Sequence, residues 1–146
     1  MRAWQIVSGA LLAAVVVACG NLTINPEYNS QPTNYTDPSF SRDIMPILTQ
    51  TCASSGACHL GPNAAAGLRL DSDSLAYASM VNVPSGFTTL PRVRPTRLDS
   101  STVWLLLQDS IATRLSYYRM PVAQLMLPQQ TIDMIGNWVV QGARNN

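Results

Sequence analysis

The sequence predicts an all-α fold in which short helices are joined by long loops. Apolar residues recur at helical spacing over residues 43–52 and 128–141, and we find no convincing pair of strands. Proline and glycine interrupt the chain between these two segments. Loops of this length are unusual in a small domain unless something fills the space between them. The pattern therefore predicts that the helices and loops enclose a space that side chains alone do not fill.

Residues 1–18 have the features of a bacterial signal peptide. Arg2 supplies a positive charge, and the apolar stretch over residues 6–18 is too short to cross a bilayer comfortably. A Val-Val-Ala sequence leads into Cys19 and resembles a bacterial lipobox. The resemblance implies cleavage before Cys19 and a diacylglyceryl group on its sulfur. Gly20 at the next position favours the outer membrane.

Residues 19–38 are expected to form a flexible tether behind the lipidated cysteine. Asn, Pro, Ser, Thr and Tyr dominate this segment, and no apolar periodicity runs through it. Two alternatives to the lipid anchor stay open: an ordinary secretory signal followed by a coincidental cysteine, or a transmembrane anchor. In each case residues 39–146 form the globular domain and lie outside the cytoplasm. Disulfides can form in such an extracytoplasmic compartment.

The first helix of the domain is expected over residues 43–52. Pro46 fits this helix if Asp43 is the N-cap, because the first N–H groups of a helix have no helical partner. The helix would then carry Cys52 at its C-terminal end. The next stretch is rich in glycine and is expected to be a loop, followed by a short extended piece at residues 68–70.

Three positions along the chain predict where later helices begin. Ser72 is expected to cap a short helix, and the Asp-Ser-Ser sequence at residues 99–101 to cap another that runs to Gln108. Residues 117–121 are expected to be a loop. Pro128 suits the first position of a last helix over residues 128–141. The apolar face of that helix and its C-cap would be Ile132, Ile135, Trp138, Val139 and Gly142.

Charge and cysteine content narrow the possible partners. The chain has 9 basic residues, all arginine, against 8 acidic residues, and loss of Arg2 with the signal peptide would balance the two. The sequence has no basic stripe of the kind that predicts nucleic-acid binding and no polybasic patch of the kind that predicts binding to an anionic membrane surface. The chain has 3 cysteines. If Cys19 carries lipid, the other two are left as a pair.

That pair is Cys52 and Cys58, and His59, the only histidine, follows directly. A Cys…Cys-His run is the signature of covalent haem attachment, in which two thiols add to the porphyrin vinyl groups and the histidine ligates iron. Five residues separate the cysteines here, where the usual run has two. In an oxidising compartment the same two thiols could instead form a disulfide. Both fates of the pair stay open.

The chain resembles the small cytochrome c domains of the planctomycete type, including relatives in bacterial lipoproteins. The resemblance covers about residues 39–143. The matching segments, in order, are residues 41–48 leading into Cys52, Cys58-His59, residues 67–70, residues 99–101, Arg119-Met120-Pro121 and residues 132–143. It implies that Cys52 and Cys58 form thioethers, that His59 is the proximal iron ligand and that Met120 is the distal one. A histidine and methionine pair would raise the reduction potential.

Other chemistries fit these residues less well. Zinc needs three or four ligands, and two cysteines with one histidine form a poor site. Adjacent Cys58 and His59 side chains diverge, so a catalytic thiol is also disfavoured. Three arginines, Arg92, Arg94 and Arg97, could hold haem propionates or could equally belong to a solvated loop.

The expected protein is a lipid-anchored, extracytoplasmic cytochrome c domain with one covalently bound haem c. It would transfer single electrons to other redox proteins of the cell envelope and would not be an enzyme. The alternative is a haem-free domain of the same shape, stapled by a Cys52–Cys58 disulfide, that serves as a structural or binding lipoprotein. The two differ in one optical property, because only the first is coloured.

Overall fold

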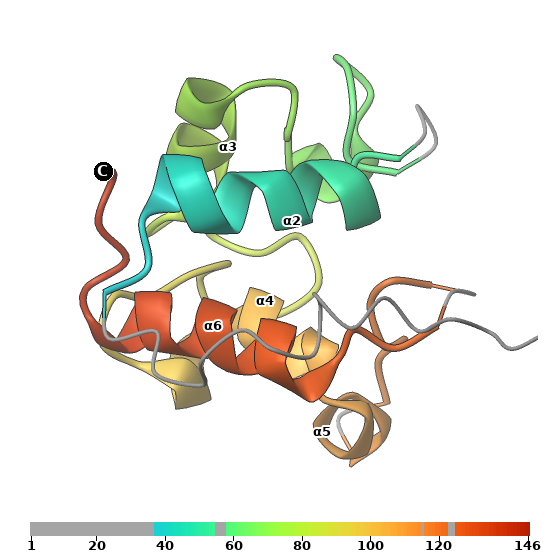
Figure 1. The fold of residues 1–146 in the computed structure, drawn as a ribbon. Helices are drawn as coiled ribbons and strands as arrows, with labels where there is room; N and C mark the ends of the chain where they lie inside the picture. Colours follow the sequence, from blue (N-terminus) through green and yellow to red (C-terminus); the bar gives the residue numbers. More distant parts are fainter. Residues whose placement is uncertain (1–36, 55–57, 115, 123–124) are drawn as a thin grey trace, which may run out of the picture. The chain divides into compact units, whose positions relative to one another are not determined.

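A computed structural model describes residues 37–54, 58–114, 116–122 and 125–146 (Figure 1). All of them belong to one compact unit, residues 32–146. The described residues form helices and two isolated bridges but no strand, which confirms the predicted all-α class. The predicted signal peptide, Cys19 and nearly all of the predicted tether lie outside the described residues.

The domain contains five α-helices among its described residues, together with one π-helical and two 3₁₀ turns. The elements are η1 (Phe40–Ile44), α2 (Met45–Thr51), η2 (Ala65–Gly67), α3 (Asp73–Met80), η3 (Leu98–Ser100), α4 (Thr102–Leu107), α5 (Asp109–Arg114) and α6 (Gln129–Val140). The loops between α2 and α3 and between α3 and α4 are long, as the sequence predicts. Figure 1 shows α4 lying alongside α6.

The first helical segment begins earlier than predicted. A π-helical turn, η1, precedes α2, and Ser39 rather than Asp43 is the N-cap, with its hydroxyl accepting the Arg42 N–H. Asp43 lies inside the turn, where its carboxylate accepts the N–H of Ser39 at 2.8 Å. Pro46 is the second residue of α2 and follows the π-helical turn, in which the Met45 N–H donates to the Phe40 carbonyl. Cys52 is the C-cap of α2, as predicted.

The later helices agree more closely with the prediction. Ser72 caps α3 and accepts the N–H of Leu75. Ser101 is at the N-cap position of α4, but its hydroxyl bonds to Arg94 and Arg97 and not to the helix. Helix α4 ends at Leu107, and α5, which the sequence pattern did not predict, begins two residues later. Pro128 is the N-cap of α6 rather than its first residue. The predicted core face of α6 is buried, and Gly142 follows the helix with a φ of 102°.

An aromatic cluster joins the first and last helical segments. Phe40 and Trp138 are essentially fully buried, with ring centroids 5.3 Å apart, and Tyr77 packs edge-on against Phe40 at 5.3 Å. Each large ring removes apolar surface from water, which is the main stabilising term in so small a domain. The Trp138 indole N–H donates to the Arg144 carbonyl at 2.9 Å, so the cluster also holds the segment after α6.

Candidate functional site

Two cavities meet at the predicted site residues, and the one with more empty space, called the larger cavity below, lies between the long loops and the helices. It encloses about 690 Å³ of empty space, part of which is open to solvent. Leucine, isoleucine, valine, alanine, phenylalanine and methionine side chains form most of its wall. Small-molecule and cofactor sites are likewise mostly apolar with a few polar groups. The polar or sulfur-bearing groups among the lining residues are Cys52, His59, Ser85, Arg92, Thr102, Met80 and Met120.

A smaller cavity of about 530 Å³ adjoins it. Its lining residues are Thr51, Cys52, Cys58, His59, Ala65, Met120, Pro121 and Val122. Cys52, His59 and Met120 line both cavities, so the two spaces meet at these side chains. The fold therefore brings together all four residues that the resemblance implies as thioether residues and iron ligands.

The two cysteines are held at the ends of a closed loop. The Cys52 N–H donates to Leu48 at the end of α2, and the His59 N–H donates to the Cys52 carbonyl at 3.2 Å. The Cys58 carbonyl in turn accepts the Ala65 N–H at 2.8 Å. Both side chains are half-buried thiols. Burial raises the pKa of the Cys52 thiol, and the Thr51 hydroxyl 3.3 Å from its sulfur partly offsets this rise.

His59 is positioned by backbone bonds on both sides. Its N–H is bound to Cys52, and its carbonyl accepts the Leu70 N–H at 2.9 Å. Burial lowers the pKa of His59, and the charge of Arg92 lowers it further, while nearby carbonyl groups oppose the shift. The neutral imidazole, which is the metal-binding form, is therefore favoured. The ring atom Nδ1 is buried without a hydrogen-bond partner of good geometry in the described part of the chain.

Met120 reaches the site from a distant part of the sequence. Its N–H donates to the Leu106 carbonyl of α4 at 2.9 Å, and its side chain packs against the core cluster. The preceding Arg119 forms an ion pair with Asp109 of α5 at 3.4 Å. Helices α4 and α5 thus set the position of Met120, and the unpredicted α5 is part of the support of the site.

The three arginines considered from the sequence have different surroundings. Arg92 is buried and lines the larger cavity, with its guanidinium donating to the carbonyls of Ser79 and Ala66. Arg94 is exposed and lines neither of the two cavities, and Arg97 is paired with Asp99 at 2.8 Å on the surface. Only Arg92 can therefore contact a group inside the larger cavity.

Several lining residues could not be recognised from the sequence. Leu106 and Leu107 of α4, Phe87 and Leu127 contribute apolar wall, and nothing in their local pattern separates them from core residues. The described residues contain no group of three or more His, Cys, Asp or Glu side chains that could hold a metal ion. A metal at His59 would therefore draw its remaining ligands from sulfur or from a cofactor.

Comparisons with known proteins leave the site to be argued from its own geometry. No protein-family model, no curated protein and no solved structure matches the chain. Among the described helices, none has the length and hydrophobicity that a membrane span requires.

Proposed function

We propose that the chain is an extracytoplasmic, lipid-anchored cytochrome c domain that carries one covalently bound haem c and transfers single electrons. One observation carries the proposal: Met120 lines the same two cavities as His59, although 61 positions separate them. Two residues that ligate one metal must meet at one space, and this pair does so beside both cysteines. The residues present therefore fit the group.

Each residue has a defined role in this proposal. Cys52 and Cys58 would add their S–H groups across the two vinyl groups, so that both thioethers form without an oxidant. His59 would offer a neutral imidazole, and Met120 a soft thioether that favours ferrous iron and raises the reduction potential. Haem supplies the one-electron chemistry at its iron.

The surrounding wall contributes exclusion of water. Apolar side chains from α2, α4 and α6 line the larger cavity, and a low dielectric around a redox centre is one of the factors that sets its potential. An electron carrier also needs a path to its partner, and the smaller cavity includes the exposed Val122. The proposed partners are other redox proteins of the envelope, with the lipid at Cys19 holding the domain near the outer membrane.

Extraction of the purified protein with acid-acetone tests covalent attachment. We expect the colour to stay with the polypeptide and a reduced sample to show sharp α and Soret bands. Cys58→Ser should remove most of the retained colour, whereas Ser54→Ala, an exposed change in the same loop, should leave it. A colourless protein would refute the proposal.

The haem-free alternative is favoured by a specific contact. The bond from the His59 N–H to the Cys52 carbonyl, at 3.2 Å, holds the backbone next to Cys58 close to Cys52, and a disulfide requires such proximity. Mass spectrometry separates the two candidates. A haem adduct supports the cytochrome, and a mass lower by the two hydrogens of a disulfide supports the stapled structural domain.

A further inference from the structure

Arg92 is a buried cation without a carboxylate partner among the described residues. Its side chain is 9% exposed, and the described ion pairs involve other arginines. Backbone carbonyls of Ser79 and Ala66 accept two of its hydrogen bonds, out of five N–H donors on a guanidinium. Carbonyl dipoles stabilise such a charge only partly, and an unpaired buried charge is costly.

The cavity itself offers Arg92 no anion. The ionisable side chains among the lining residues of the larger cavity are Cys52, His59 and Arg92, and none of them is a carboxylic acid. Burial raises the pKa of the Cys52 thiol, so it is not a ready source of negative charge. The described lining residues thus supply no acid group, so a carboxylate beside Arg92 would come from an occupant.

The backbone around Arg92 is arranged to hold the guanidinium at this place. Ala66 and Gly67 both have positive φ, 54° and 69°, and this turn directs the Ala66 carbonyl toward the arginine. A Cβ atom on Gly67 would lie 3.5 Å from the Arg92 Nη2 atom, so the turn and the guanidinium are in close contact. The Ser79 carbonyl, near the end of α3, holds the other terminal nitrogen.

We propose that Arg92 is the acid-binding group of the larger cavity, which takes an occupant with an apolar body and a carboxylate. The apolar wall would hold the body, and the free N–H donors of Arg92 would hold the carboxylate. The inference rests on the proposed function in that it concerns the same cavity, but it does not require iron or thioether bonds. A haem propionate and a free apolar acid share this chemistry.

Whether the isolated full chain is coloured decides whether a haem propionate or a free apolar acid is tested as the carboxylate. If the protein carries haem, its reduction potential is measured from pH 5 to pH 9. The potential falls as a propionate loses its proton, and an Arg92 partner lowers the pKa of that propionate by about 1–3 units. Arg92→Gln should therefore move the fall in potential to higher pH, while Arg92→Lys should leave it closer to the wild-type position.

If the protein is colourless, dodecanoate and dodecanol are the probes, because they differ only in the acid group. A charge-assisted bond to a buried guanidinium should make dodecanoate bind about tenfold to a hundredfold more tightly than dodecanol. Arg92→Gln should abolish this preference. The comparison of the two probes on the unaltered chain stands even if Arg92→Gln does not fold.

Arg94→Gln is the matched control in both cases. Arg94 is two positions away and exposed, and the described bonds of this residue to Ser101 use its backbone atoms. An effect of Arg92→Gln that Arg94→Gln does not share supports the inference, with the coloured protein identifying a propionate and the colourless one a free acid. Equal effects of the two variants, or equal binding of dodecanoate and dodecanol, would overturn it.

Discussion

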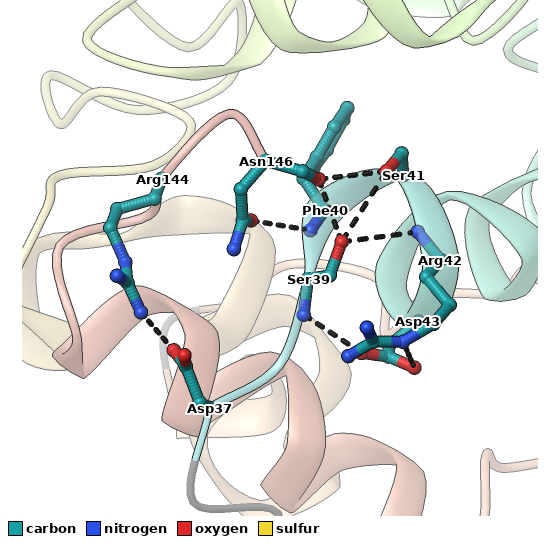
Figure 2. Close-up of polar contacts among 8 residues, drawn as sticks. All are labelled: Asp37, Ser39, Phe40, Ser41, Arg42, Asp43, Arg144 and Asn146. Atoms are coloured by element: carbon teal, nitrogen blue, oxygen red, sulfur yellow. Dashed lines mark hydrogen bonds and ion pairs between the residues drawn. The ribbon is translucent and has the colours of Figure 1, made fainter.

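Removal of one hydroxyl, in Ser39→Ala, should weaken the joint between the start and the end of the domain. The Ser39 hydroxyl donates to the Asn146 carbonyl at 2.7 Å and accepts the Arg42 N–H at 3.4 Å (Figure 2). Ser39 itself is buried, and both of these contacts are part-buried. The substitution therefore removes a long-range contact and a helix cap together.

The magnitude follows from these two contacts. A neutral hydrogen bond, such as the part-buried one to Asn146, contributes about 1 kcal/mol to the free energy of unfolding. Loss of a serine N-cap costs about 0.5–2 kcal/mol, and the long 3.4 Å contact places this cap at the lower end. Together they predict a loss of about 1.5 kcal/mol, which for a domain of this size lowers Tm by roughly 6 °C.

Ser41→Ala is the matched control. The Ser41 hydroxyl also donates to the Asn146 carbonyl, at 2.8 Å, but the contact is exposed and the Ser41 N–H holds the same oxygen at 3.0 Å. Its loss should cost at most about 0.5 kcal/mol. Urea unfolding at 25 °C, followed by tryptophan fluorescence, to which the buried Trp138 contributes, measures both variants. If Ser39→Ala is no more destabilising than Ser41→Ala, the capping argument is wrong.

Three further changes test other parts of the structure. Asp43→Asn should destabilise the domain at pH 7 by about 1 kcal/mol, because the carboxylate loses its charge-assisted bond to the backbone. The Arg42 side chain and the Ser39 N–H lower the pKa of Asp43, so this stabilisation is present above about pH 4 and is lost as the pH falls further. Urea unfolding should therefore show a smaller difference in the free energy of unfolding between wild type and Asp43→Asn at pH 2.5 than at pH 7. An equal difference at the two pH values would contradict the assignment. Met120→Ala should abolish the weak near-infrared charge-transfer band of the oxidised protein and lower its potential, and an unchanged spectrum would mean that another ligand occupies that position. Cys19→Ala should release the protein into the soluble fraction with an unchanged spectrum, since the tether, whose reach is about 25 Å, would have lost its anchor; a protein that stays wholly with membranes after a high-salt wash would refute the lipid anchor.

The helices that could be predicted are those whose signals are local. Ser72 precedes α3 with its hydroxyl three residues from the N–H it caps, and the buried stripe of α6 recurs at helical spacing. The start of η1 was predicted wrongly, because Pro46 favoured a helix that begins at Asp43, whereas the structure begins it at Phe40 with a π-helical turn. Helix α5 has only 6 residues, which is too short for an apolar period, so no sequence pattern predicted it.

The candidate site likewise combines residues that local spacing predicts with residues that only the fold brings together. Cys52, Cys58 and His59 are adjacent enough for their spacing alone to predict a shared chemistry. Their meeting with Met120 depends on the bond of its N–H to α4, which no local pattern contains. The choice among Arg92, Arg94 and Arg97 is also tertiary, because three arginines within six residues look alike in sequence and only one of them is buried against a cavity.

The sequence by itself thus determined the helical class, the cap of α3 and the identity of the thiol and imidazole groups. Periodicity, capping and ligand spacing are set by interactions within a few residues, so they can be recognised along the chain. The tertiary structure decided that Met120 lines the same cavities as His59, which arginine lies in the larger cavity and how the start and end of the domain are held together. Those outcomes depend on burial and on contacts between distant segments, and only the packed core brings such segments to one place.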